Sequence, residues 1–207
     1  RMGRVQQKIV VMDLEGVLVP EIWIAFAEKT GIEELRLTTR DIQDYDVLMK
    51  GRLKILEQHK LGLKEIQEAI ATLKPLPGAL EFLNQLRSKT QVVILSDTFE
   101  QFAAPLMKQL NWPTLLCHRL VVDEESGKII DYKLRQEDQK RQAVKAFQSL
   151  NYKVIAFGDS FNDTGMLSQA DRAFFFHAPL NVQEKFPEFP PFDDYDKLME
   201  ELDRHLA

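Results

Sequence analysis

Two pairs of acidic residues could act together in one reactive site. Asp13 and Glu15 lie two positions apart, directly after a short apolar run. In an extended loop, side chains at that spacing project to the same side, so one carboxylate can attack a substrate while the other handles a proton. Asp159 and Asp163 follow another apolar run. Carboxylate oxygens are the ligands that Mg²⁺ prefers in proteins, so this pair indicates a metal site.

Each pair also has a simpler explanation. Asp13 and Glu15 could be solvated loop acids, because acidic residues are common after strands. Asp163 could cap a helix that begins near Thr164. Capping explains Asp159 less well, since it stands at the start of the loop rather than at the start of the helix. The acidic pairs therefore gain meaning from the other polar residues that share the site with them.

A hydroxyl group and a lysine would complete a phosphate site. Ser96, Asp97 and Thr98 follow a further apolar run. A hydroxyl and backbone N–H groups at a strand-to-helix turn are well placed to hold phosphoryl oxygens. Taken alone, Ser96 or Thr98 is more often a helix N-cap. Lys140, at the start of a helical pattern, could balance the charges of carboxylates, phosphate and metal. Lys133 is the rival for that role.

Alternating patterns predict the fold that would position these residues. Short apolar runs at residues 9–12, 92–95, 154–157 and 173–176 are typical of strands buried on both faces of a parallel sheet. Helical periodicity covers residues 79–88 and 139–150. The alternation predicts a Rossmann-like, doubly wound α/β fold. Ligands of such sheets bind beyond the carboxyl ends of the strands, which is where the polar clusters fall.

Two insertions interrupt this alternation. Residues 21–74 show no strand pattern, and their helical patterns predict a small helical cap inserted after the first strand. Those patterns cover residues 23–29, 39–52, 53–60 and 63–73. The runs 116–122 and 128–134 flank a Gly-containing turn, which predicts a β-hairpin insertion. We expect an α/β core from residues 1–20 and 75–207, a cap from 21–74, and a last helix over 195–206 after a Pro-rich loop.

Bulk composition excludes several classes of function. The 207 residues carry a net charge of −5, which argues against a nucleic-acid or anionic-membrane surface. No segment approaches the length of a membrane span, and the first residues lack the apolar core of a signal peptide. Cys117 is the single cysteine, so we expect a reducing cytoplasm and a buried strand thiol rather than a nucleophile.

The polar clusters resemble a known set of motifs. Asp-x-Glu-Gly at 13–16, Ser-Asp-Thr at 96–98, Lys140, and Gly-Asp-x-x-Asn-Asp at 158–163 occur in this order on an α/β pattern. As a set they resemble the four motifs of the haloacid dehalogenase-like superfamily, and they extend over the core of the chain. The resemblance implies a Mg²⁺-dependent reaction that passes through an aspartyl-phosphate.

The same resemblance implies a role for each residue. Asp13 would be the nucleophile, Ser96 would hold the phosphate and Lys140 would neutralise charge. Glu15 would transfer the proton, so the expected catalytic residues are these four. The expected metal ligands are Asp13, Glu15, Asp159 and Asp163.

The predicted cap and hairpin make the chain similar to phosphoserine phosphatases. Glu21 and Arg52 match the positions where that family contacts the ammonium and carboxylate of its amino-acid substrate, and an arginine fork is well suited to bind a carboxylate. Without this resemblance, the simpler interpretation of Arg52 is a charged side chain on the solvent-exposed face of a helix. The expected substrate-binding residues are Glu21, Arg52, Ser96, Asp97, Lys140 and Asn162.

One departure from the family pattern bears on which molecule accepts the phosphoryl group. Glu15 stands where the usual residue is Asp, and the segment 13–23 closely resembles the phosphoserine–homoserine phosphotransferase type. That resemblance implies O-phosphoserine as substrate and homoserine as a possible acceptor instead of water. Two alternatives stay open: a phosphatase of the same superfamily for another small phosphometabolite, and a non-enzymatic, response-regulator-like module. The helical insertion and the second acidic cluster argue against the latter.

Overall fold

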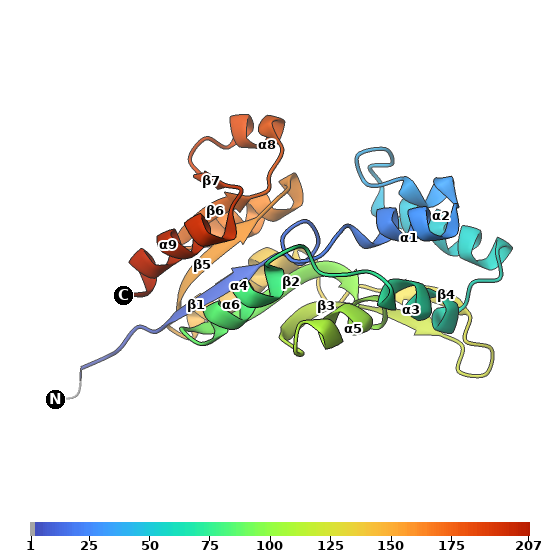
Figure 1. The fold of residues 1–207 in the computed structure, drawn as a ribbon, viewed down its shortest axis with the longest axis horizontal. Coiled ribbons are helices and arrows are strands. Elements are labelled where there is room, and N and C mark those ends of the chain that lie inside the picture. The colour runs from blue at the N-terminus through green and yellow to red at the C-terminus, as the bar shows by residue number, and fades with distance from the viewer. Residues whose placement is uncertain (1–2) are drawn as a thin grey trace.

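A seven-stranded sheet forms the centre of the protein, in the order β4-β3-β2-β1-β5-β6-β7 (Figure 1). The computed structural model describes residues 3–207, so Arg1 and Met2 of the expected core lie outside the described residues. Adjacent described strands are parallel except for the antiparallel pair β3–β4. The strands are β1 (Lys8–Met12), β2 (Gln91–Phe99), β3 (Thr114–Val122), β4 (Ile129–Lys133), β5 (Lys153–Gly158), β6 (Arg172–Phe176) and β7 (Pro191–Phe192).

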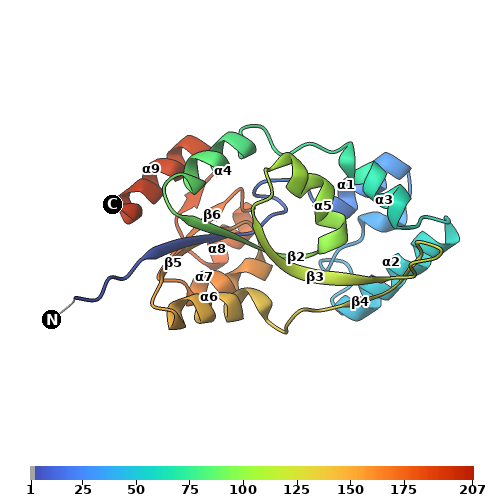
Figure 2. The same ribbon diagram turned by 90° about the horizontal axis from the view of Figure 1, so that it is seen from below.

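Helices cover both faces of this sheet, which confirms the predicted α/β fold class. On β1, Val10 and Met12 belong to one apolar cluster while Ile9 and Val11 belong to another. Both faces are buried, and this explains why the central strands are continuously apolar. One face is covered by α4 (Ala79–Arg87), α5 (Glu100–Gln109) and α9 (Tyr195–Leu206), the other by α6 (Gln139–Ser149), α7 (Thr164–Gln169) and α8 (Leu180–Lys185) (Figure 2).

The segment after β1 is helical, as predicted, but with different boundaries. Its elements are α1 (Ile22–Thr30), the 3₁₀ turn η1 (Glu33–Arg36), α2 (Tyr45–Gln58) and α3 (Leu63–Ala71). The prediction of separate helices over 39–52 and 53–60 was wrong, since α2 runs through both. It begins at Tyr45 because the Asp44 side chain caps it, accepting a hydrogen bond from the Val47 N–H at 3.1 Å.

The predicted hairpin is present as β3 and β4. Gly127, with φ +73°, supplies the left-handed conformation that its turn needs. Because β3 also pairs in parallel with β2, the hairpin extends the sheet. It also contacts the helical segment: the Tyr132 hydroxyl donates to Asp46 at 2.6 Å, and Gly127 accepts a hydrogen bond from the Leu63 N–H at 2.8 Å. These contacts place α1, α2 and α3 at the β4 end of the sheet (Figure 1).

Strand β2 is longer than predicted, which changes the setting of the second motif. The strand continues to Phe99, with a shift of its register against β3 between Leu95 and Phe99. Helix α5 then begins at Glu100, and Phe99 occupies its N-cap position. The expected strand-to-helix turn at Ser96 is therefore wrong, and so is the alternative that Ser96 or Thr98 caps a helix.

Helix α5 was not predicted, because Pro105 interrupts its sequence. A proline inside a helix leaves the carbonyl four residues earlier without its usual donor. That carbonyl belongs to Gln101, and it accepts a hydrogen bond from the Gln67 side chain of α3 at 2.9 Å. A side chain from a distant helix thus makes the proline tolerable.

The single thiol lies inside the sheet. Cys117 is buried on β3, and burial raises the pKa of its thiol to about 12. Within residues 3–207, no helix combines the length and the apolar character needed to cross a membrane.

We expect Cys117 to react slowly with a thiol reagent such as dithionitrobenzoate at pH 8. The thiolate is the reactive form, and both burial and the raised pKa keep it scarce. Native protein should react far more slowly than protein unfolded in guanidinium, as followed by absorbance. Equal rates for the two would contradict the burial of this strand.

Candidate active site

Three neighbouring strands bring the predicted motifs to one edge of the sheet. Asp13 directly follows β1, and the loop that carries Asp159 and Asp163 follows β5, which pairs with β1. On the other side of β1, strand β2 carries Ser96 and Asp97 near its carboxyl end. Parallel pairing of β2, β1 and β5 therefore assembles residues that are up to 150 positions apart in the sequence.

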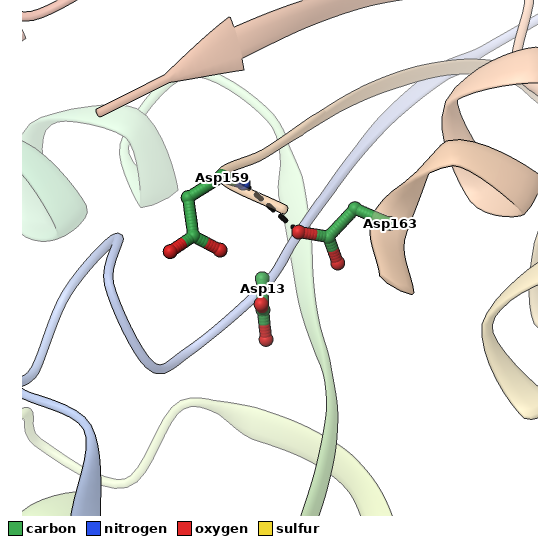
Figure 3. Close-up of side chains that lie close together, drawn as sticks. All are labelled: Asp13, Asp159 and Asp163. Atoms are coloured by element: carbon green, nitrogen blue, oxygen red, sulfur yellow. Dashed lines mark hydrogen bonds between the residues drawn. The ribbon is translucent and has the colours of Figure 1, made fainter. Parts of the chain in front are cut away.

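Three carboxylates form a compact cluster at this edge (Figure 3). Asp13, Asp159 and Asp163 each offer one oxygen, and these oxygens lie within 4.8 Å of one another. The Oδ2 of Asp163 accepts hydrogen bonds from the backbone N–H groups of Asp159 at 2.9 Å and Ser160 at 3.1 Å. Asp163 stands at the N-cap position of α7, but its side chain makes no capping hydrogen bond there, so the capping alternative is wrong. The side chain instead shapes the loop before it and joins the cluster. A Cβ at Gly158 would collide with the Asp163 side chain, so this position requires glycine.

The ammonium group of Lys140 supplies positive charge to the cluster. Its Nζ lies 2.8 Å from Asp163 Oδ1, 3.3 Å from Asp13 Oδ1 and 4.0 Å from Asp97 Oδ2. Burial alone would lower the pKa of Lys140, but these carboxylates raise it well above its usual value. Lys133, the rival candidate, is an exposed residue of β4. The geometry therefore favours Lys140 over Lys133.

The charges of the cluster fit a divalent cation. Burial and the nearby Asp163 raise the pKa of Asp13 well above its usual value. The same two causes raise the pKa of Asp159 to about 8. Three clustered carboxylates with one lysine leave an excess of negative charge, and their hard oxygen donors suit Mg²⁺. These residues therefore fit the metal ion that the motifs imply.

Glu15 lies apart from this three-carboxylate cluster among the described residues. Its Oε1 accepts a hydrogen bond from the Ile22 N–H at 2.8 Å, at the start of α1. Burial raises the pKa of its carboxyl group to about 7. The position suits proton transfer between the sheet edge and the helical segment, whereas its role as a metal ligand stays a prediction.

The two residues predicted to bind an amino acid lie in the helical segment. Arg52 is buried, with its guanidinium 4.6 Å from the centre of the Trp23 ring and its Nη2 donating to the Leu37 carbonyl at 3.0 Å. Its Nε has no hydrogen-bond partner among residues 3–207. Glu21 is partly exposed, and its Oε1 lies 3.8 Å from Arg40 Nη2.

Two clefts open onto this edge of the sheet. One, of about 390 Å³, is lined by Tyr45, Asp97 and Lys140, among others. The other, of about 620 Å³, is lined by Glu21 and Asp159, among others. Asn162 lines both clefts, which places it where they meet. Ser96 is fully buried and is not among the lining residues of either cleft, and its Oγ accepts a hydrogen bond from the Thr98 N–H at 3.2 Å.

Three residues of the site were missed by the sequence reasoning. Tyr45 of α2 lines the smaller cleft, and His118 and Gln139 are buried polar residues that contact Asp97. The sequence offered one weak signal for Gln139, its position beside Lys140. Nothing in the sequence distinguishes Tyr45 or His118 from residues of the apolar core.

The sheet order and the acid–lysine cluster at its carboxyl edge define a doubly wound α/β protein of the phosphoryl-transfer type. Comparison with protein-family models makes this assignment specific. Residues 7–171 match the family of haloacid dehalogenase-like hydrolases. The chain therefore belongs to that family and is a hydrolase, which confirms the resemblance seen in the motifs.

Individual relatives agree with this assignment. A phosphoserine phosphatase of Pseudomonas syringae pv. tomato is 61% identical over 97% of this chain and 84% of its own length. Phosphoserine phosphatase ThrH of Pseudomonas aeruginosa is 62% identical over 94% of this chain and 95% of its own length. The structure of a substrate-bound phosphoserine phosphatase covers 97% of this chain and 99% of its own, with a TM-score of 0.72 at 19% identity. That likeness, at such low identity, concerns the fold.

We expect Mg²⁺ to raise the melting temperature of the protein. A cation that binds the folded site stabilises it by about 2.7 kcal/mol at a hundredfold excess over its Kd, or roughly 5 °C or more for a chain of this size. Asp159→Asn should lose most of this shift, as measured by calorimetry with and without Mg²⁺. Asp203→Asn, which removes an exposed acid ion-paired with Lys89, should keep it. An equal shift in both variants would contradict the assigned metal site.

Proposed function

We propose that this hydrolase is a Mg²⁺-dependent phosphoserine phosphatase that acts through an aspartyl-phosphate on Asp13, with homoserine able to replace water as acceptor. The observation that carries the proposal is the buried guanidinium of Arg52, whose Nε has no partner among residues 3–207. An unpaired, buried donor costs free energy unless a ligand satisfies it, and a carboxylate is its natural partner. The names of the two Pseudomonas relatives support the same substrate.

The opposite charges of Arg52 and Glu21 match the two ends of an amino acid. Arg52 would bind the substrate's carboxylate through its fork of N–H donors, and Glu21 would bind its ammonium group. Arg52 and Glu21 both lie near enough to influence the ionisation of Glu15. Glu15 also connects the two regions by contact, since it lies two residues after Asp13 and accepts a hydrogen bond from the Ile22 N–H, next to Glu21.

The phosphate end of the substrate would face the core. Lys140 and Asn162, which line the smaller cleft together with Asp97, would hold its oxygens, and the buried Ser96 would assist them. Asp13 and Asp159 would hold Mg²⁺ together with Asp163, with Glu15 as a further proposed ligand. When bound, Mg²⁺ supplies positive charge that balances the phosphoryl oxygens.

The reaction would proceed in two steps. In the first, a carboxylate oxygen of Asp13 attacks phosphorus, the bond from phosphorus to the serine oxygen breaks, and Glu15 gives that oxygen a proton. In the second, Glu15 takes a proton from water or from the homoserine hydroxyl as that oxygen attacks the aspartyl-phosphate. Asp13 is released, and Glu15 is again protonated for the next cycle.

Residues 21–74 would serve as the cap over this reaction, and residues 3–20 and 75–207 as the core. The segment borders both clefts through Thr39 and Gln43 of the loop before α2, and it borders the smaller cleft through Tyr45 of α2 as well. A helical cover that excludes bulk water strengthens the electrostatic interactions inside the site. We place the enzyme in the cytoplasm, in serine or threonine biosynthesis. A response-regulator-like module is disfavoured because the chain belongs to a hydrolase family.

Incubation with O-phosphoserine and Mg²⁺ tests the proposal directly. We expect steady release of inorganic phosphate over many turnovers, and formation of phosphohomoserine when homoserine is added. Both products can be measured by phosphorus NMR. Turnover of sugar phosphates or nucleotides at a higher kcat/KM than phosphoserine would overturn the proposed substrate.

Arg52→Ala should impair recognition of phosphoserine selectively. Loss of a charge-assisted contact of about 1.5–3 kcal/mol corresponds to roughly a 10- to 100-fold lower kcat/KM. Hydrolysis of 4-nitrophenyl phosphate, which has no amino-acid groups, should change far less. Arg36→Ala is the matched control, since Arg36 is in the same segment but pairs with Glu28 and Glu33. Equal losses for both substrates would point to misfolding or to a different role for Arg52.

Glu15→Asp should change the partition between hydrolysis and transfer. The shorter side chain withdraws the proton-transferring group by one methylene, and shifts of about 1 Å in such sites change rates by roughly a hundredfold. The ratio of phosphohomoserine to phosphate is the quantity to measure at fixed homoserine concentration. An unchanged ratio would show that Glu15 does not select the acceptor.

A further inference from the structure

Asp97 is held by a buried network that the proposed reaction leaves without a function. Its Oδ1 lies 3.1 Å from His118 Nε2 and accepts a second hydrogen bond from Gln139 Nε2 at 3.0 Å. On the far side of the imidazole, His118 Nδ1 accepts a hydrogen bond from the Arg135 N–H at 2.9 Å. A nitrogen that accepts carries no proton, so the neutral ring has its proton on Nε2. His118 therefore donates to Asp97.

The orientation of Gln139 is fixed by the same logic. Its Oε1 accepts a hydrogen bond from the Arg135 side chain at 2.7 Å, so its amide nitrogen must face the other way. That nitrogen donates to the Ser96 carbonyl at 2.7 Å and to Asp97. His118 and Gln139 are each 3% exposed. Donors from β3 and α6 thus converge on a single oxygen of Asp97.

The second oxygen of Asp97 is left available. Among residues 3–207, no group donates a hydrogen bond to Oδ2, and the nearest cation is Lys140 Nζ at 4.0 Å. Asp97 lines the cleft of about 390 Å³, as does Tyr45 of α2. Burial alone would raise the pKa of Asp97, but hydrogen bonds from His118 and Gln139 and the charge of Lys140 hold it well below its usual value. The cleft is thus lined by a fixed, ionised carboxylate.

We propose that His118 is a positioning residue that, with Gln139, holds Asp97 so that its Oδ2 faces the ammonium group of an amino-acid substrate. A carboxylate beside a phosphate site repels the phosphoryl oxygens, so it favours binding only if its free oxygen is directed at a cation. Lys140 is held more closely by Asp163 and Asp13, at 2.8 and 3.3 Å, than by Asp97 at 4.0 Å, which leaves Oδ2 free for a cation of the substrate. This inference rests on the proposed function, and it gives the ammonium group a second carboxylate partner besides Glu21.

His118→Phe tests the positioning role, because it keeps a ring and removes the donor. We expect the KM for phosphoserine to rise about tenfold, as for the loss of one charge-assisted contact. The kcat for phosphoserine and the kcat/KM for 4-nitrophenyl phosphate should stay within about twofold. His118→Gln, whose amide can replace the Nε2 donor, should restore much of the affinity. In an Asp97→Asn background, His118→Phe should have no further effect, because His118 acts through Asp97.

A matched control separates positioning from stability. Gln101 also bridges to β3, through the backbone of Leu120, but it does not contact Asp97. Gln101→Leu should lower the melting temperature without raising the KM for phosphoserine. A similar loss for both substrates in His118→Phe, or the same tenfold effect in the Asp97→Asn background, would overturn the inference. Either result would indicate that Asp97 acts on Lys140 or that His118 contributes to stability alone.

Failure of the proposed function would look different. A wild-type protein that hydrolyses 4-nitrophenyl phosphate but not phosphoserine would overturn that function and the ammonium contact with it. A wild-type protein that hydrolyses phosphoserine, with no selective loss in His118→Phe, would overturn only the inference. Long-range ¹H–¹⁵N NMR measures which ring nitrogen of His118 carries the proton. We expect the Nε2–H tautomer, and the other tautomer would contradict the network.

Discussion

The buried ammonium group of Lys140 is the interaction on which the site depends. It lies within 3.3 Å of carboxylate oxygens of both Asp13 and Asp163. Carboxylates this close repel one another strongly in a low-dielectric setting, and a lone buried cation would be equally unfavourable. Each group is tolerable because the others are present. The sheet order meets this requirement, since β2, β1 and β5 are adjacent and Lys140 at the start of α6 reaches the carboxylates beyond them.

Much of the fold could be predicted because its central strands are buried on both faces, which leaves continuous apolar runs in the sequence. The runs ending at Met12 and Phe157 both proved to be strands, with the predicted acids directly beyond them. The prediction failed where a distant contact decides the local structure. Helix α5 tolerates Pro105 because Gln67 satisfies a free carbonyl, and no local pattern carries that information.

The site was predictable to the extent that its residues form ordered motifs. Asp13, Asp159, Asp163 and Lys140 were predicted because their motifs, taken in order, resemble those of a known family, and the structure brings them together. The network behind Asp97 was not predictable, because His118 lies in an apolar strand and Gln139, the other donor to Asp97, begins a helix twenty-one residues later. Asp97 also lies where the register of β2 against β3 shifts, between Leu95 and Phe99. Such contacts arise from tertiary structure and leave no periodic signal.

The most direct test of the account is rapid-quench labelling of the enzyme with ³²P-phosphoserine. The account predicts a transient acyl phosphate, labile to hydroxylamine, that maps to the peptide containing Asp13. Asp13→Asn should show neither label nor turnover, once deamidation back to Asp is excluded by mass spectrometry. Rapid turnover with no label on Asp13, or undiminished turnover by the Asp13→Asn protein, would contradict the covalent mechanism.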